Sequence, residues 1–188
     1  VEAFNRQVIT EPFNRTVLAE IARDIDPESP DVQGKTLIFA VNDDHADLIV
    51  KILKEIYTEM GVDNDAIMKI TGSVGGGNKK KVKDAIKRFK NERFPSVVVT
   101  VDLLTTGIDV PAITTLVFMR RVKSRILFEQ MMGRATRRCP DIHKTHFEIY
   151  DTVGVYDSLE AVNTMKPVVA NPSTTFEQLL EGQEVRSE

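Results

Sequence analysis

Short, mostly apolar segments that alternate with helical patterns constrain the fold of this chain more than any other feature. Residues 35–41, 96–101 and 113–119 each fit a buried strand, and the second is almost wholly β-branched. Runs that are apolar throughout are typical of parallel strands with both faces covered. Between these runs, apolar residues recur at helical spacing. The alternation predicts an α/β fold in which a parallel sheet is flanked by helices on both faces.

The individual elements follow from the same patterns. Strands are expected at residues 35–41, 66–70, 96–101, 113–119 and 146–150. Helices are expected at residues 11–25, 78–90 and 124–134, and a further one, capped by Asn42, should run to about residue 60. Residues 26–34 are predicted to form a loop and residues 71–77 a flexible turn, because turn-forming residue types dominate both segments.

Composition excludes several classes of protein. The chain has 188 residues, enough for one domain with its own core, and a formal net charge of −3, so bulk charge does not indicate a nucleic-acid binder. Cys139 is the single cysteine, which rules out an internal disulfide and fits a reducing compartment. No apolar run approaches the roughly 18 residues that span a membrane, and no signal peptide opens the chain. Because the chain begins at Val1 in mid-pattern, we expect a fragment of a longer protein.

Polar residues crowd the exit of the strand at residues 96–101. Ligand sites of open parallel sheets form where the carboxyl ends of strands meet the following loops. Gly107 permits close approach of a backbone, and Asp109 lies just before a stiff Val-Pro pair. The other polar residues of this segment are Thr100, Asp102, Thr105 and Thr106. The alternative interpretation is a capped loop, since Asp and Thr favour such positions anyway.

A second motif combines Gln130, Gly133, Arg134 and Arg137 in one short segment. Arg134 and Arg137 are three residues apart, so on a helix they would share a face. Two guanidinium groups on one face suit an anionic target, because each presents a rigid fork of donors to phosphate oxygens. The alternative is a solvated helix end, where arginine complements the helix dipole.

Together these motifs resemble the second motor lobe of superfamily-2 helicases and translocases, over about residues 35–150. Residues 35–40 are similar to the first strand motif of that lobe, and Thr71 and Gly72 to its nucleic-acid backbone loop. Residues 98–111 resemble the fifth helicase motif and residues 130–137 the sixth. Residues 4–15 and 165–169 are similar to segments that flank this lobe in the restriction (R) subunit of type I restriction-modification enzymes. That subunit is a DNA-translocating ATPase that also cleaves DNA.

The resemblance implies a RecA-like fold and a role in ATP hydrolysis. Arg134 and Arg137 would act as arginine fingers on the γ-phosphate of ATP, and Gln130 would help to order that site. The nucleotide cleft would be lined by Gly107, Asp109 and Gly133. In this family ATP and Mg²⁺ are held mainly by the first lobe, so we expect the isolated fragment to have no ATPase activity.

The resemblance also implies contacts with the DNA backbone, which carries no sequence information. The residues expected to make them are Thr71, Gly72, Thr100, Lys79 and Lys80. The two lysines begin a basic run that extends to Lys90. Such runs usually form a solvated helix face. Here the run starts just after the proposed backbone loop, so some of its lysines could instead steer DNA.

The same resemblance suggests a domain organisation and a set of partners. Residues 1–30 would form an N-terminal helical linker, residues 31–160 the RecA-like lobe and residues 161–188 a connector to a following domain. The partners would be double-stranded DNA, the first lobe and nuclease domain of the same full-length chain, and the modification and specificity subunits. We expect the cytoplasm of a bacterium or archaeon and no membrane. The alternatives are a lobe of another superfamily-2 helicase and a stand-alone α/β domain that binds a phosphorylated ligand.

Two kinds of site are not expected within this chain. Residues 33–36 mimic the end of a phosphate loop, but Ser29 stands where the first glycine should be, and the strand follows the lysine instead of preceding the loop. Cys139, His143 and His146 have a spacing that could suit a metal. They provide three ligands without a clear fourth, so no metal site is predicted.

Overall fold

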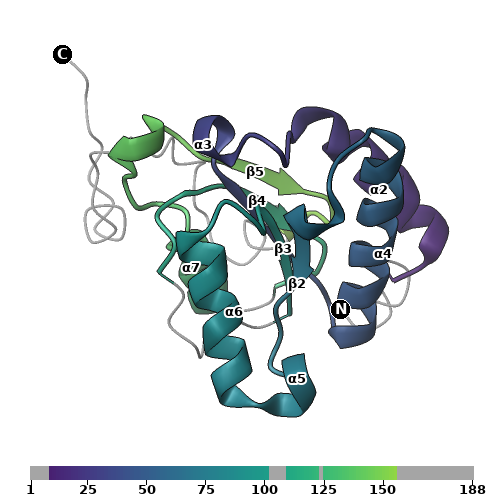
Figure 1. Ribbon diagram of the computed structural model, residues 1–188. Helices are drawn as coiled ribbons and strands as arrows, with labels where there is room; N and C mark the ends of the chain where they lie inside the picture. Colours follow the sequence, from purple (N-terminus) through teal and green to yellow (C-terminus); the bar gives the residue numbers. More distant parts are fainter. Residues whose placement is uncertain (1–8, 102–108, 123–124, 156–188) are drawn as a thin grey trace.

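The computed structural model describes residues 9–101, 109–122 and 125–155, and it shows a parallel sheet between two layers of helices (Figure 1). The sheet has five strands in the order β2-β3-β1-β4-β5, and every neighbouring pair is parallel. The strands are β1 (Lys35–Phe39), β2 (Ile67–Lys69), β3 (Val97–Thr100), β4 (Ile113–Phe118) and β5 (Glu148–Asp151). The α/β class and the parallel sheet predicted from the sequence are confirmed.

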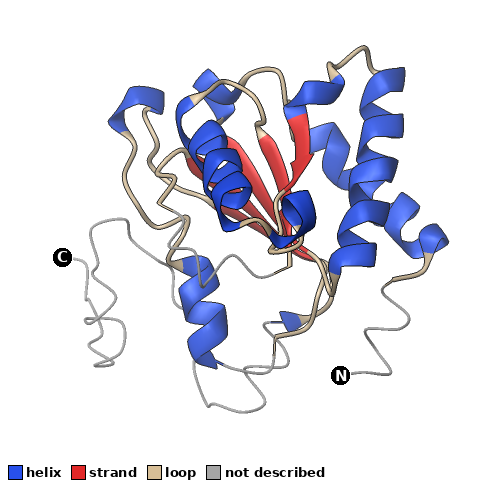
Figure 2. Cartoon of the chain, turned by 60° about the horizontal axis from the view of Figure 1, so that its bottom comes forward, coloured by secondary structure: helices blue, strands red, loops and turns tan. Residues whose placement is uncertain are grey.

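Helices cover both faces of the sheet. On one face lie α2 (Glu11–Asp24) and α4 (Asp43–Glu59), and on the other α6 (Lys79–Asn91) and α7 (Arg125–Met132) (Figure 1). Figure 2 shows the strands enclosed between these layers. The shorter elements are α3 (Pro30–Gln33), α5 (Val74–Gly77) and the 3-10 helices η1 (Asn64–Ala66) and η3 (Pro140–Ile142). Asn42 caps α4 as predicted, because its side chain accepts a hydrogen bond of 2.8 Å from the backbone N–H of His45.

Each strand contributes to two separate apolar cores, because its side chains alternate between the two faces. Leu37 and Phe39 of β1 belong to the core under α6 and α7, where the Phe39 ring stacks on that of Phe118 with centroids 5.3 Å apart. Ile38 and Ala40 belong to the core under α2 and α4. Burial of both faces explains why these strands are apolar at nearly every position.

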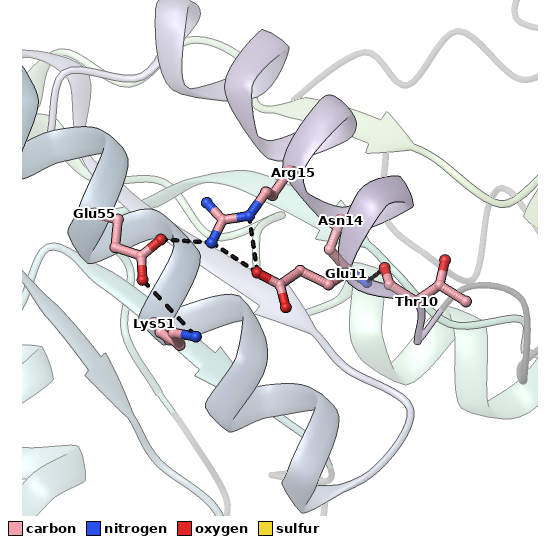
Figure 3. Close-up of polar contacts among 6 residues, drawn as sticks. All are labelled: Thr10, Glu11, Asn14, Arg15, Lys51 and Glu55. Carbon is pink, nitrogen blue, oxygen red and sulfur yellow. Dashed lines mark hydrogen bonds and ion pairs between the residues drawn. The ribbon is translucent and has the colours of Figure 1, made fainter.

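The N-terminal helix α2 is packed into the second of these cores. Its residues Leu18 and Ile21 are buried against α4. Figure 3 shows the polar contacts beside this packing, in which Arg15 lies 2.7 Å from Glu11 and 2.7 Å from Glu55 of α4. Exposed ion pairs each contribute about 0–1 kcal/mol, so the apolar contacts hold the helix in place. The domain boundaries expected at residues 30 and 160 remain predictions.

Three local predictions are wrong. The expected loop at residues 26–34 contains α3, which begins at Pro30, since the fixed φ of proline suits a first helical position. The expected turn at residues 71–77 contains the single helical turn α5. The helix expected to reach residue 134 ends at Met132. Beyond it the chain continues in tighter turns, with the Arg134 N–H donating to the Met131 carbonyl at 3.2 Å.

Candidate functional site

The predicted arginine segment lies at and just beyond the end of α7. Met131 and Ala135 are buried in the apolar core and anchor the segment to the body of the domain. Arg134 between them is half-buried, and Arg137 is exposed. Because α7 ends at Met132, the two arginines lie in the turns after the helix and do not share a helical face, so that expectation is wrong.

Two further predicted residues of this segment are exposed. Gln130 lies on the last turn of α7, and Gly133 follows the helix. A Cβ atom at Gly133 would lie 3.4 Å from the Glu129 carbonyl oxygen, which is a contact that a small side chain could make with little adjustment. The local backbone therefore gives no strong steric reason for a glycine at this position.

Asp109 joins the arginine segment to the end of α6. Its Oδ1 lies 2.5 Å from Nη1 of Arg137, and its Oδ2 lies 3.4 Å from Nζ of Lys90. The carboxylate and the guanidinium are both partly solvent-exposed. The structure thus brings together Asp109 and Arg137, which the sequence analysis assigned to the same cleft without predicting their contact.

The rest of the predicted strand-exit motif lies elsewhere. Gly107, with Asp102, Thr105 and Thr106, falls outside the described residues. Thr100 is the last residue of β3 and is fully buried, and its hydroxyl has no hydrogen-bond partner among the described residues. In this arrangement the Thr100 hydroxyl does not reach the surface, so its expected contact with a DNA phosphate stays a prediction.

A polar cluster forms around Asp43, the first residue of α4. Its carboxylate accepts hydrogen bonds from the hydroxyls of Thr71 and Ser73, at 2.5 and 2.7 Å, and from Nζ of Lys69 at 2.9 Å. Lys69 also lies 2.6 Å from Asp47, one turn further along α4. The hydrogen bond from Thr71 and those from Lys69 and Ser73 lower the pKa of Asp43 to about 2, so it is ionised at neutral pH.

This cluster was not predicted from the sequence, in which Thr71 and Gly72 stood without their partner on α4. The available signal was positional, because Asp43 follows β1 and Thr71 follows β2, and the carboxyl ends of parallel strands meet at the same edge of a sheet. Gly72 lies between the two hydroxyl residues and is exposed, and no heavy atom of the described residues beyond its two chain neighbours lies within 4 Å of the position of a Cβ atom.

The basic helix α6 begins after α5 and presents a row of lysines to solvent. Its apolar side is buried through Val82 and Phe89, as its helical spacing predicted. Exposed lysines with no ion-pair partner among the described residues are Lys79, Lys80, Lys81, Lys83 and Lys87. A row of lysines without ion-pair partners is compatible with a solvated helix face and with a surface that binds an extended polyanion such as DNA. The geometry alone does not distinguish these two interpretations.

The sequence that mimics a phosphate loop lies at the opposite edge of the sheet. Lys35 begins β1, so a strand follows this sequence, as predicted. Its Nζ donates to the carbonyl oxygens of Glu92 and Pro95, at 2.6 and 2.9 Å, and burial lowers its pKa to about 8. Lys35 is therefore held by backbone carbonyls, and residues 33–36 do not have the geometry of a phosphate site.

A cavity of about 300 Å³ opens at this same amino edge of the sheet. Its lining is polar and includes Gln33, Thr36, Thr114, His143 and Glu148, but none of the predicted site residues. Within the described ranges, no group of three or more His, Cys, Asp or Glu side chains could hold a metal ion. No helix in these ranges combines the length and the apolar character needed to cross a membrane.

Comparisons with known proteins identify the family of the chain. The helicase conserved C-terminal domain family matches residues 17–139. The chain is 46% identical over 182 residues to the type I restriction enzyme EcoKI endonuclease subunit of Escherichia coli K12, a match that covers 96% of this chain and 15% of that protein. The chain therefore spans only a small part of the length of this relative.

Solved structures give the same result. A fragment of an HsdR subunit of a type I restriction enzyme from Vibrio vulnificus superimposes with a TM-score of 0.67 and 26% identity, over 84% of this chain and 30% of the other. Domain 2 of the DEAD-box helicase Mss116p matches with a TM-score of 0.59 and 19% identity, over 95% of this chain and 64% of the other, which shows the RecA-like fold alone. The chain belongs to the helicase conserved C-terminal domain family and is similar to the endonuclease (R) subunits of type I restriction enzymes.

Proposed function

We propose that this chain is the second motor lobe of an ATP-dependent double-stranded DNA translocase, the R subunit of a type I restriction enzyme. The observation that carries the proposal is the placement of Arg134 and Arg137 after α7. Buried Met131 and Ala135 fix this segment, and the guanidinium of Arg137 remains exposed. A fixed, exposed guanidinium can reach a phosphate on a neighbouring domain.

In this proposal ATP and Mg²⁺ are bound mainly by a first lobe outside this chain, and ATP supplies the γ-phosphoryl group that is transferred to water. Arg134 and Arg137 stabilise the negative charge that develops on this group, and such arginine fingers accelerate hydrolysis by about 10³–10⁵-fold. Gln130 lies on the adjacent turn of α7 and helps to order the site. Gly107, Asp109 and Gly133 line the cleft on this side.

Asp109 also contacts Arg137 directly. The carboxylate lies 2.5 Å from the Arg137 guanidinium. A phosphate that enters the cleft competes with this carboxylate for the same donors, since both are acceptors that match the guanidinium fork. Asp109 therefore orients Arg137 on this side of the cleft.

The proposed DNA track lies along the turn after β2 and the start of α6. Gly72, Lys79 and Lys80 are exposed and can contact phosphates directly. Thr71 belongs to the same turn, and Thr100 ends the neighbouring strand β3. Such contacts follow the backbone without reading bases, as a translocase requires. The full-length protein would work with its own nuclease domain and with modification and specificity subunits in the cytoplasm of a bacterium or archaeon.

Alanine substitutions in the full-length subunit, assembled with its partner subunits, test this function. Arg134→Ala and Arg137→Ala should each reduce DNA-stimulated ATP hydrolysis by about a thousandfold or more, within the range of arginine-finger effects. Arg138→Ala is the matched control, because Arg138 is exposed in the same segment and forms no hydrogen bond or ion pair in the described part of the chain. Turnover near that of the wild type in both test variants would contradict the proposed role.

A further inference from the structure

The Asp43 cluster ties two strand exits together at the carboxyl edge of the sheet. Asp43 follows β1 and opens α4, whereas Thr71 and Ser73 follow β2. The hydroxyls of Thr71 and Ser73 lie 2.5 and 2.7 Å from the same oxygen, Oδ1 of Asp43, and 2.9 Å from each other. Lys69, at the end of β2, binds the other oxygen, Oδ2, at 2.9 Å.

The hydroxyl hydrogens of Thr71 and Ser73 are both used within this cluster. Each hydroxyl has one hydrogen to donate, and the carboxylate can only accept. Both hydroxyl hydrogens are therefore used within the cluster, whichever way the Thr71–Ser73 contact is oriented. A phosphate group also only accepts hydrogen bonds at neutral pH. The Thr71 hydroxyl, on a residue only 3% exposed, thus has no hydrogen left for a DNA phosphate.

Gly72, between the two hydroxyl residues, is in the opposite situation. It is exposed, and among the described residues no heavy atom outside Gly72 and its two chain neighbours lies within 4 Å of the position where a Cβ would be. Its backbone N–H, like that of Ser73, donates no hydrogen bond to any group of the described residues. A close phosphate would therefore meet an available donor at Gly72 and none at the flanking hydroxyls.

We propose that Asp43 is a positioning residue for the DNA contact: it fixes the Thr71–Ser73 turn, draws both hydroxyls to itself, and leaves the Gly72 backbone N–H as the donor that faces a phosphate. This inference rests on the proposed function of the chain. It changes the role expected of Thr71 from a direct contact to an anchor of the turn.

Further contacts fix the Asp43 carboxylate in place. Lys69 bridges Asp43 and Asp47, which are one helical turn apart, and so ties the end of β2 to two positions of α4. Asn42 caps the same helix through the His45 N–H. The carboxylate is ionised throughout the neutral pH range, because its hydrogen bonds lower the pKa of Asp43 to about 2. Asp43 therefore accepts these hydrogen bonds as a carboxylate at the neutral pH at which DNA binding is measured.

The test compares Asp43→Ala with Asp44→Ala in the full-length subunit assembled with its partner subunits. Asp44 is the next residue of α4, is exposed, and makes no ion pair or side-chain hydrogen bond in the described part of the chain. Both variants remove one negative charge, which alone would strengthen binding to a polyanion. We expect Asp43→Ala to raise the DNA concentration for half-maximal ATP hydrolysis by roughly threefold to tenfold, as the loss of one ordinary net hydrogen bond gives, with a smaller effect on turnover at saturating DNA.

Thr71 variants separate an anchoring role from a direct contact. Thr71→Val, which removes the hydroxyl at nearly constant shape, should weaken DNA binding, and Thr71→Ser should restore it. If Thr71 acts only through Asp43, the double variant Asp43→Ala/Thr71→Val should bind DNA no more weakly than Asp43→Ala alone. If the hydroxyl contacts DNA itself, the double variant should bind DNA more weakly than Asp43→Ala does. That result would overturn the proposal.

Two further comparisons keep the result interpretable. Thermal unfolding of each variant checks the fold. If Asp43→Ala unfolds, Asp43→Asn, which keeps an acceptor oxygen, and the Thr71→Val/Thr71→Ser pair carry the test. A wild-type subunit without DNA-stimulated ATP hydrolysis would contradict the proposed function itself. A wild type with that activity, together with equal DNA affinity of the Asp43→Ala and Asp44→Ala variants, would overturn only the role given to Asp43.

Discussion

The guanidinium of Arg137 lies 2.5 Å from the carboxylate of Asp109, a residue 28 positions earlier in the chain. One of the two arginines proposed to act on ATP is thus already held by an acidic side chain from the preceding strand-exit segment. The pair is partly exposed, so its contribution to the free energy of unfolding is small, about 0–1 kcal/mol. The proposed role of the pair is to orient the Arg137 guanidinium for ATP hydrolysis.

We predict that Asp109 and Arg137 act as one unit in ATP hydrolysis. Asp109→Ala should lower DNA-stimulated turnover, and the double variant Asp109→Ala/Arg137→Ala should be no slower than Arg137→Ala alone, because coupled residues show non-additive effects. Lys90→Ala is the control, since it removes only the 3.4 Å contact with Asp109. Losses that multiply in the double variant would show that the two residues act independently.

The exposed lysines of α6 should determine part of the salt dependence of DNA binding. Each lysine that neutralises a phosphate contributes about 0.9 to the slope of log Kd against log salt concentration. Replacing Lys79 and Lys80 by Gln should therefore reduce this slope by about 1–2, measured on the full-length subunit with double-stranded DNA. Replacing Lys51 and Lys54 of α4, on the other face of the sheet, is the matched control. Equal slopes in both double variants would assign the α6 lysines to a solvated face.

Substitution of Gly72 should affect DNA binding without affecting the fold. Apart from its two chain neighbours, no described residue lies within 4 Å of the Cβ position, so Gly72→Ala should leave the melting temperature unchanged or slightly raised. The added methyl group stands where a phosphate is proposed to approach, so DNA affinity should fall. Gly34→Ala provides the contrast: its φ is 81° and its Cβ would lie 2.7 Å from the Ala112 carbonyl oxygen, so it should lower the melting temperature. Wild-type DNA affinity in Gly72→Ala would remove this turn from the proposed DNA track.

His45 should make the stability of the fold depend on pH. Its Nδ1 accepts from the Val41 N–H at 3.1 Å, so Nε2 carries the proton and donates to Asn14 at 2.9 Å. Burial lowers the pKa of His45 from 6.5 to about 4. Between these values the unfolded chain binds the proton more readily, so stability falls as the pH decreases from 6.5 to about 4 and is insensitive to this group above 6.5.

Urea unfolding measures this effect. Lowering the pH from 7 to 5 should cost about 2 kcal/mol of unfolding free energy through His45, at about 1.4 kcal/mol for each pH unit below 6.5. His45→Gln should flatten the profile in this range. His146→Gln, at an exposed position, should leave the profile unchanged. A steep profile that survives His45→Gln would assign the pH dependence to other groups.

The sequence by itself determined the architecture and the family of this protein. The strands β1, β3 and β4 were predictable because burial on both faces requires apolar residues at nearly every position, and this pattern is visible in the chain. The helical spacing of α4 and α6 was equally visible. The order of the motifs at residues 98–111 and 130–137 indicates a helicase lobe from the sequence alone. Short elements such as α3 and α5 escaped prediction, because one helical turn has no detectable periodicity.

Only the tertiary structure decided which polar side chains meet. The partners Asp109 and Arg137 are far apart in the sequence, as are Asp43 and Thr71, and no spacing rule connects them. Their contacts depend on the strand order β2-β3-β1-β4-β5, which places separate strand exits at one edge, and on where α7 ends. The sequence determines which donors and acceptors each side chain carries. The packing of the sheet and helices determines which other groups they contact.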